Sequence, residues 1–182
     1  MKKLKWMLNL MALSLFTFSC QSEANEVQEE EQDFNERIEL SQLDSIRTVL
    51  NDAMPAVPVD LFRKAIAMHL QFAEHNPDHE FAPVALDYAQ GFYEQIQDFR
   101  SSLMVINRIL NDYPNYKGKQ LLMYNKATHH DFLRDTTEAR QSYEAYLKEF
   151  PNLSADDKEE IEELIRLVPY SIEERIKMQS GL

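Results

Sequence analysis

The chain has 182 residues, a net charge of −12 and a single cysteine, Cys20. The acidic excess repels phosphate backbones and argues against nucleic-acid binding. One cysteine excludes an internal disulfide and a multi-cysteine metal site. With only three glycines, the chain also has no glycine-rich phosphate-binding loop. These features leave one acidic domain of ordinary size.

The first 19 residues have the pattern of a secretory signal peptide. Three lysines within residues 1–5 precede an apolar stretch over 6–18, which is shorter than the ~20 residues of a membrane-spanning helix. The small residue Ser19 stands directly before Cys20. These residues resemble a bacterial lipoprotein signal, which implies that Cys20 is acylated, with palmitate among the expected chains. The alternative is an ordinary signal peptide and a free thiol.

Residues 21–37 hold seven acidic residues and one basic residue. Such a segment cannot bury enough apolar surface to fold alone. We therefore expect a flexible tether over 20–37 and a folded domain over 38–180. Gln21 follows the cysteine, where an aspartate would resemble an inner-membrane retention signal, so the outer membrane is the expected location. The acidic run is either a plain spacer or a surface-export signal.

A repeat of 37 residues organises the rest of the chain. Pro77, Pro114 and Pro151 are spaced by this period, and each closes a stretch with helical periodicity. Shifting the chain by 37 also aligns three further sets of residues: Ala65 with Ser102 and Ala139, Phe72 with Ile109 and Tyr146, and Asp98 with Asp135. Self-similarity at this period predicts stacked helix pairs rather than a single globular core.

The apolar periodicity and the prolines place the helices. In chain order, the expected ranges are 38–54 and 59–75, 81–96 and 99–112, 117–133 and 136–150, and a capping helix over 155–168. Ser154 is the expected N-cap of the capping helix. A short helix from 171 to about 178 should follow, anchored by Ile172 and Ile176.

The helix–turn–helix pattern, the small residues Ser102 and Ala139, the aromatic Tyr93 and the closing prolines resemble tetratricopeptide repeats. The segments 72–83, 109–127 and 135–165 are similar to small tetratricopeptide lipoproteins of Bacteroidota. This resemblance implies an all-α, tetratricopeptide-like helical-hairpin solenoid of about three helix pairs plus a C-terminal capping helix. It also implies a protein-binding scaffold at the cell envelope.

In this repeat architecture the first helix of each pair lines the concave groove. Alignment with the repeat predicts six groove residues: Asp87, Gly91, Glu94, Tyr124, Thr128 and Asp131. Gly91 either lets a partner backbone approach closely or only relieves crowding between helices. Because the groove carries acids, a basic or amide-rich segment is the expected ligand.

The sequence contains no Gly-x-Ser-x-Gly and no His-Glu-x-x-His motif, so we expect no catalytic residue, no metal ligands and no cofactor. His69 and His130 fall at inward repeat positions and are expected to pack as neutral residues. The favoured function is a lipid-anchored envelope protein that binds another protein or peptide segment without catalysis. One alternative is an accessory subunit of outer-membrane protein assembly. Another is a metal or small-ligand binder that uses His75 and His79.

Overall fold

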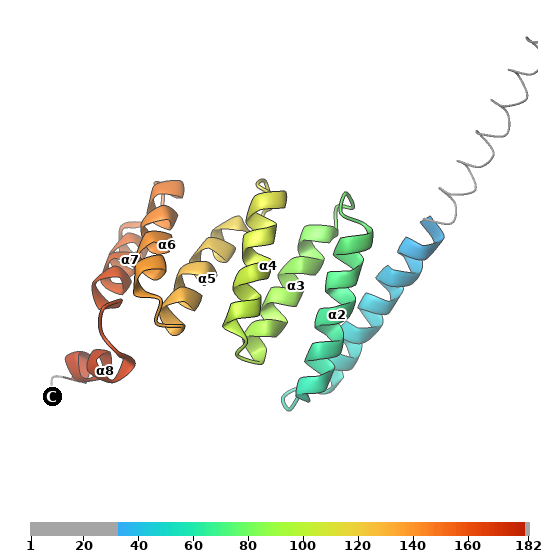
Figure 1. Ribbon diagram of the computed structural model, residues 1–182, viewed down its shortest axis with the longest axis horizontal. Helices are drawn as coiled ribbons and strands as arrows, with labels where there is room; N and C mark the ends of the chain where they lie inside the picture. The colour runs from blue at the N-terminus through green and yellow to red at the C-terminus, as the bar shows by residue number, and fades with distance from the viewer. Residues whose placement is uncertain (1–32, 181–182) are drawn as a thin grey trace, which may run out of the picture. The chain divides into compact units, whose positions relative to one another are not determined.

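The computed structural model describes residues 33–180, in which all eight regular elements are α-helices (Figure 1). The signal peptide, Cys20 and residues 21–32 lie outside the described residues. The chain divides into two units, one ending at Ser45 and the other beginning at Ile46. None of the helices within 33–180 combines the length and the apolar character that crossing a membrane requires.

The first described segment is helical from residue 33, and the same helix continues to residue 52. The helix therefore includes residues 33–37, which the sequence analysis assigned to the tether. The Arg37 guanidinium lies 3.3 Å from the carboxylate of Asp33, four residues earlier. Pairs at this spacing favour a helix even where the side chains remain in solvent, so low apolar content does not exclude helix at this point.

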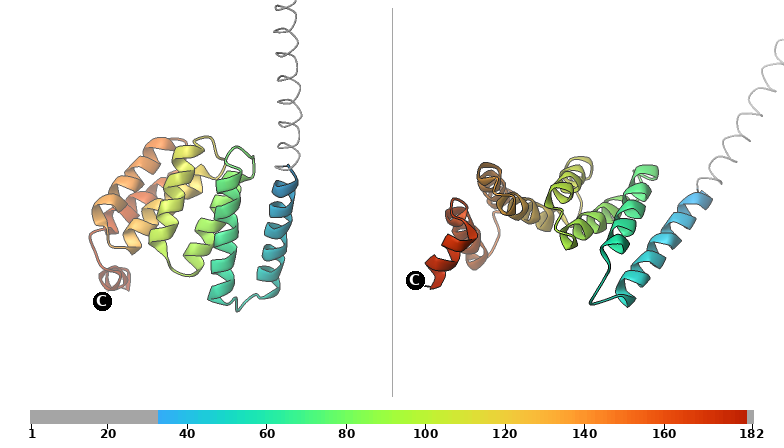
Figure 2. Two further views of the ribbon diagram at one scale, coloured as in Figure 1. Left: turned by 45° about the vertical axis from the view of Figure 1, so that its right-hand side comes forward. Right: turned by 60° about the horizontal axis from the view of Figure 1, so that its bottom comes forward.

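Seven further helices follow in the second unit, and neighbours in the chain pack against each other from the first of them to the sixth (Figures 1 and 2). They are α2 (Val59–His75), α3 (Ala82–Gln95), α4 (Phe99–Asp112), α5 (Lys119–Phe132), α6 (Thr136–Glu149), α7 (Ala155–Leu167) and α8 (Ile172–Ser180). The all-α prediction is confirmed, and the sequential packing in adjacent pairs is that of a helical-hairpin array.

The 37-residue period is also present in the backbone. The residues that follow α2, α4 and α6 donate their N–H groups to the carbonyls four residues earlier, in the pairs Asn76–Phe72, Tyr113–Ile109 and Phe150–Tyr146. Gln97 and Arg134 both have a positive φ, 59° and 60°. Each precedes an aspartate N-cap, Asp98 or Asp135, and the 37-residue period aligns these two aspartates. The repeat therefore fixes turn geometry as well as helix length.

The aligned small residues are buried within the helical array. Ala65, Ser102 and Ala139 are all fully buried, with 0% exposure. Ala65 belongs to an apolar cluster with Ile46 and Leu50. Ala139 belongs to a second cluster, completed by Ala127, Tyr143, Tyr146, Ile161 and Val168. A larger side chain at any of these positions would push neighbouring helices apart.

The short helix α8 is held by charge rather than by its isoleucines. Ile172 and Ile176, the predicted anchors, are 57% and 59% exposed. Instead, the Arg175 guanidinium donates two hydrogen bonds of 2.6 Å to the Asp131 carboxylate near the end of α5. Arg134 adds a bond of 2.8 Å to the Tyr170 carbonyl. The anchoring prediction was wrong because helical spacing cannot show which side of a short helix faces its neighbour.

His69 of α2 is fully buried, as predicted. Its Nδ1 lies 2.7 Å from the Ala65 carbonyl, and a carbonyl only accepts, so Nδ1 carries a proton. Its Nε2 has no hydrogen-bond partner among the described residues. Burial lowers the pKa of His69, the Ala65 carbonyl opposes that shift, and repulsion from Arg47 adds to it. The imidazole is therefore held neutral.

This neutral histidine predicts that acid destabilises the fold. An unfolded histidine takes up a proton near pH 6.5, whereas folded His69 does so only at lower pH. The free energy of unfolding should therefore fall as the pH drops below about 6.5. His69→Phe should make that decline shallower in urea unfolding measured from pH 7.5 to 5.0. Gln71→Ala, at an exposed position of the same helix, should keep the wild-type slope; equal slopes in both variants would contradict this assignment.

Candidate functional site

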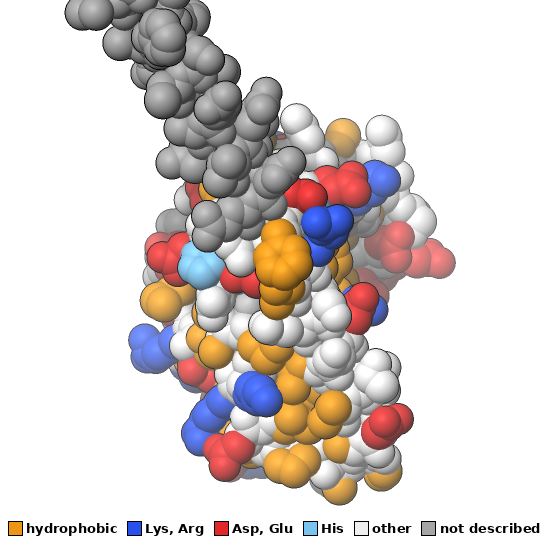
Figure 3. All heavy atoms as spheres, turned by 90° about the vertical axis from the view of Figure 1, so that its right-hand side faces the viewer, with side chains coloured by type: hydrophobic (Ala, Val, Ile, Leu, Met, Phe, Trp, Pro, Cys, Tyr) orange, Lys and Arg blue, Asp and Glu red, His pale blue; other side chains and the backbone are white. Residues whose placement is uncertain are grey.

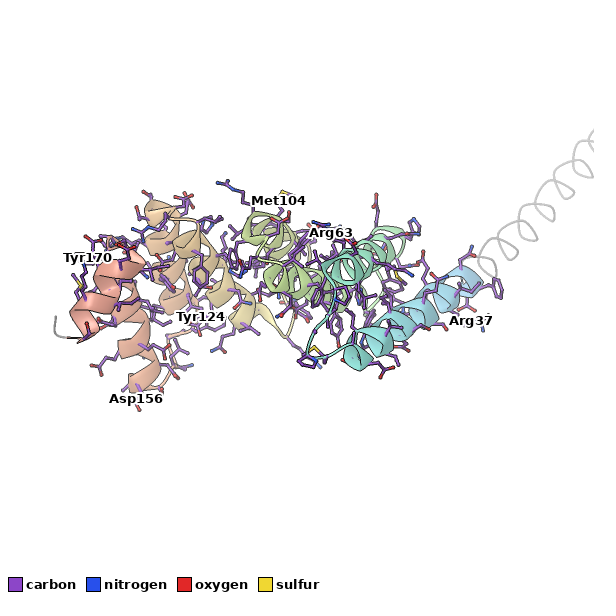
Figure 4. The ribbon with its side chains drawn as sticks, turned by 90° about the horizontal axis from the view of Figure 1, so that it is seen from below. Arg37, Arg63, Met104, Tyr124, Asp156 and Tyr170 are labelled. Carbon is purple, nitrogen blue, oxygen red and sulfur yellow. The ribbon has the colours of Figure 1, made fainter. Side chains whose placement is uncertain are left out.

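The helices of the second unit form two sides, which Figure 4 shows through its labelled residues. Arg63 of α2 and Met104 of α4 lie on one side. Tyr124 of α5 and Asp156 of α7 lie on the other. Helices α2 and α4 are the second helices of their pairs, whereas α5 is a first helix and α7 is the capping helix. The six predicted groove residues all belong to first helices, α3 and α5.

An open pocket of about 380 Å³ lies between α3 and the segment that leads into α2. It contains three of the predicted groove residues, Asp87, Gly91 and Glu94, on successive turns of α3. The other lining residues, which the sequence analysis did not identify, are Leu50, Asn51, Met54, Val57, Phe62, Tyr88, Phe92 and Gln95. Most of them are apolar, so the pocket has an apolar floor with two carboxylates beside it.

The same end of the second unit carries exposed apolar side chains. Figure 3, which views the right-hand side of Figure 1, shows hydrophobic side chains gathered in the lower part of that face. Met54, which lines the pocket, is 64% exposed, and Val59 at the start of α2 is 49% exposed. Large apolar side chains exposed beside a pocket are typical of an interaction site.

Gly91 keeps the pocket open. A Cβ atom at this position would have no atom of the described neighbours within 4 Å. The interpretation that Gly91 relieves crowding between helices is therefore wrong. A glycine inside a helix costs about 1 kcal/mol relative to alanine. Packing between helices does not explain why a glycine is present here. A glycine does, however, leave the α3 backbone accessible within the pocket.

Asp87 is oriented by two neutral donors. The Tyr116 hydroxyl donates to Asp87 Oδ2 over 2.7 Å, and Gln90 Nε2 donates to Oδ1 over 3.0 Å. Burial raises the pKa of Tyr116, and its hydrogen bond to Asp87 raises it further. Gly118 makes room for this arrangement, since a Cβ there would lie 2.5 Å from the Tyr116 ring. The aspartate therefore has a fixed position at the pocket.

The two glycines should respond in opposite directions to the same substitution. Gly91→Ala should raise the free energy of unfolding by about 0.5–1 kcal/mol, because it adds helix propensity without a clash. Gly118→Ala should lower it by about 1 kcal/mol, because Tyr116 must move away from Asp87. Urea unfolding followed by circular dichroism measures both. A loss of stability in Gly91→Ala would show that the pocket is more closely packed than described.

A buried polar network joins α3, α4 and α5. Ser102 Oγ donates to Gln90 Oε1 over 3.2 Å and lies 3.1 Å from His129 Nε2. The same His129 nitrogen lies 3.0 Å from Glu94 Oε1, which also accepts a bond of 3.1 Å from Asn125. Ser102 is fully buried and His129 is 3% exposed. The network thus provides hydrogen-bond partners for polar groups that would otherwise be unpaired inside the array.

This serine, histidine and glutamate do not have the geometry of a catalytic triad. In a triad the serine and the acid contact different ring nitrogens of the histidine. Here both contact Nε2, and His129 Nδ1 has no partner among the described residues. Ser102 is also out of reach of a substrate because it is fully buried. The arrangement supports packing between helices rather than nucleophilic attack.

Both histidines of α5 have largely buried side chains. The His130 side chain is 15% exposed and burial lowers its pKa, as expected of an inward residue, while its neighbour His129 is buried more deeply. Helix α5 packs on both α4 and α6, so one inward direction does not describe it. Of the proposed metal-binding pair, His79 already accepts a hydrogen bond from the Phe81 N–H over 3.0 Å. Within residues 33–180, no three potential ligands gather at a metal-binding distance.

The α5 half of the predicted groove is largely occupied by contacts within the fold. Tyr124 packs edge-on against Tyr143 and Tyr146. Thr128 donates to a carbonyl of its own helix, at Asn125, over 3.0 Å. Asp131 is 9% exposed, because Arg175 covers it from 44 residues away. The α3 part of the predicted surface is therefore the part that lines this pocket.

The fold and the pocket together define the class of protein, an all-α array of helical hairpins with an open pocket on α3. No protein-family model matches the chain, and no curated protein matches its sequence.

Proposed function

We propose that this chain is a lipid-anchored envelope protein, with a tetratricopeptide-like helical array that binds another envelope protein without catalysing a reaction. The signal-like residues before Cys20 support the anchor. The 37-residue repeat in sequence and backbone supports the repeat class. The observation that carries the binding role is the α3 pocket, where Gly91 leaves the helix backbone accessible beside apolar walls.

A protein segment fits this pocket better than a substrate that must be enclosed. The pocket is open, has an apolar floor and presents a few polar groups from one helix, which is how helix surfaces receive anchor side chains of a partner. Ser102 and His129 are buried, and of their network only the Glu94 carboxylate reaches the pocket. Binding rather than turnover is the function that these features favour.

The test is site-specific photo-crosslinking in intact envelopes with the anchored, full-length chain. A photoreactive residue replaces Gln95, an exposed residue that lines the pocket. The control places it at Arg140, an exposed residue of α6 that does not line the pocket. We expect a protein adduct at position 95 that is absent at position 140, identified by mass spectrometry. No adduct at position 95, or the same adducts at both positions, would reject a partner at this pocket.

A further inference from the structure

We propose that the α3 pocket recognises a partner segment in which a bulky apolar side chain stands within one or two residues of a lysine or arginine. The apolar side chain enters the pocket beside Gly91, and the cation pairs with Glu94 or Asp87. This inference rests on the proposed binding function and specifies the chemistry of its ligand.

The walls of the pocket suit an apolar anchor. The rings of Phe62 and Phe92 have centroids 5.9 Å apart, and Tyr88 stacks on Phe92 at 6.1 Å. Met54 stands at the edge with an exposed, flexible side chain that can adapt to the shape of its ligand. Filling such a site removes apolar surface of both partners from water, which is the main source of binding free energy.

The carboxylates supply the preference for a cation. Glu94 uses only Oε1 in its bonds to Asn125 and His129, and its Oε2 accepts no hydrogen bond from the described residues. Asp87 receives bonds only from uncharged donors there, Tyr116 and Gln90. Neither carboxylate forms an ion pair with a lysine or arginine in the described part of the chain. Both carboxylates therefore place negative charge beside an apolar site.

The positions of the two carboxylates set the spacing. They are seven residues apart on α3, or about 10 Å along the helix at 1.5 Å per residue. Gly91 lies between them, so an anchor seated at Gly91 has a carboxylate about 5 Å away along the helix axis on either side. An extended partner chain advances about 3.3 Å per residue, which places a suitable cation one or two residues from the anchor.

A second copy of the chain is a less suitable occupant. Each copy carries a net charge of −12, so two copies repel each other, whereas a basic segment is attracted. The charge complementarity therefore favours an external, basic partner.

The test uses the full-length lipidated protein in nanodiscs and fluorescence anisotropy with three fluorescein-labelled, 12-residue peptides. The first has a leucine flanked two residues away on each side by arginine in a Gly/Ser background. The second replaces both arginines with glutamate, and the third replaces the leucine with serine. We expect the first peptide to bind at least tenfold more tightly than either of the others, with an affinity that falls as salt concentration rises.

Variants separate the two parts of the site. Gly91→Leu should fill the pocket and lower the affinity for the first peptide at least tenfold. Circular dichroism should show the wild-type helix content. Glu94→Gln should reduce the advantage of the arginine peptide over the glutamate peptide. Glu138→Gln removes the same charge from an exposed position of α6 outside this pocket, and it should leave the affinities for all three peptides unchanged.

Three results would overturn the assignment of the ligand. One is no binding of any peptide, and another is equal or tighter binding of the glutamate peptide. The third is concentration-dependent self-association in sedimentation that Gly91→Leu abolishes, which would make a second copy the occupant. An adduct at position 95 in the cross-linking experiment together with any of these results would leave the binding function intact and reject only its proposed chemistry.

Discussion

Asp131→Ala is expected to release α8 from the array and to lower the local stability of that helix by about 3 kcal/mol. The Asp131 and Arg175 side chains are 10% and 16% exposed, and two hydrogen bonds of 2.6 Å join them. Removing one partner of such a pair leaves the other charge buried without compensation. With Ile172 and Ile176 exposed, little apolar packing remains to hold α8.

Hydrogen exchange resolved by residue measures this effect. Amides of α8 should exchange at least a hundredfold faster in Asp131→Ala, while those of α3 and α4 keep their wild-type rates. Glu173→Ala, an exposed acidic residue on the same helix, is the matched control and should leave exchange unchanged. Unaltered protection of α8 in Asp131→Ala would mean that other contacts hold this helix.

Ser102→Leu should lower the free energy of unfolding by about 4 kcal/mol. The larger side chain overpacks a fully buried helix contact, which costs about 1–3 kcal/mol. It also removes the hydroxyl between Gln90 and His129, and a buried polar group left unpaired costs about 1–3 kcal/mol more. Ser102→Ala keeps the volume small and should cost only about 1 kcal/mol.

Chemical unfolding in urea distinguishes these contributions. Met104→Leu introduces the same residue at a 70% exposed position of the same helix and should change stability by less than about 0.5 kcal/mol. If Ser102→Leu cost no more than Ser102→Ala, close packing at the aligned small residue would be rejected. Because the repeat aligns Ala65 and Ala139 with Ser102, Ala65→Leu and Ala139→Leu should also destabilise the fold through overpacking.

The helices could be predicted from sequence because strong local signals agree with one another. The ranges expected at 59–75 and 99–112 coincide with α2 and α4, and those of α3, α5 and α6 differ by one or two residues at one or both ends. Prolines, aspartate caps and apolar periodicity all act within one or two helical turns. The start of the first helix was less predictable, because an exposed acidic helix has little apolar pattern.

The site was less accessible to sequence reasoning because its features depend on tertiary neighbours. Alignment with the repeat found Asp87, Gly91 and Glu94, which do share one pocket. It could not show that Arg175 forms an ion pair with Asp131, because the two residues are 44 positions apart and no local signal links them. The pocket walls from residues 50–62 lie in a part of the first pair where the repeat aligned no residues.

The sequential packing of α2 to α7 has a consequence for how quickly the protein reaches its native state. Contacts between chain neighbours give a low contact order, which is typical of domains that fold in microseconds to milliseconds. A helix pair can form as soon as it and its predecessor are available, without waiting for the far end of the chain. The Asp131–Arg175 ion pair joins residues 44 positions apart, which is a longer loop than those between neighbouring helices. The C-terminal helix should therefore dock last, after the hairpins have folded.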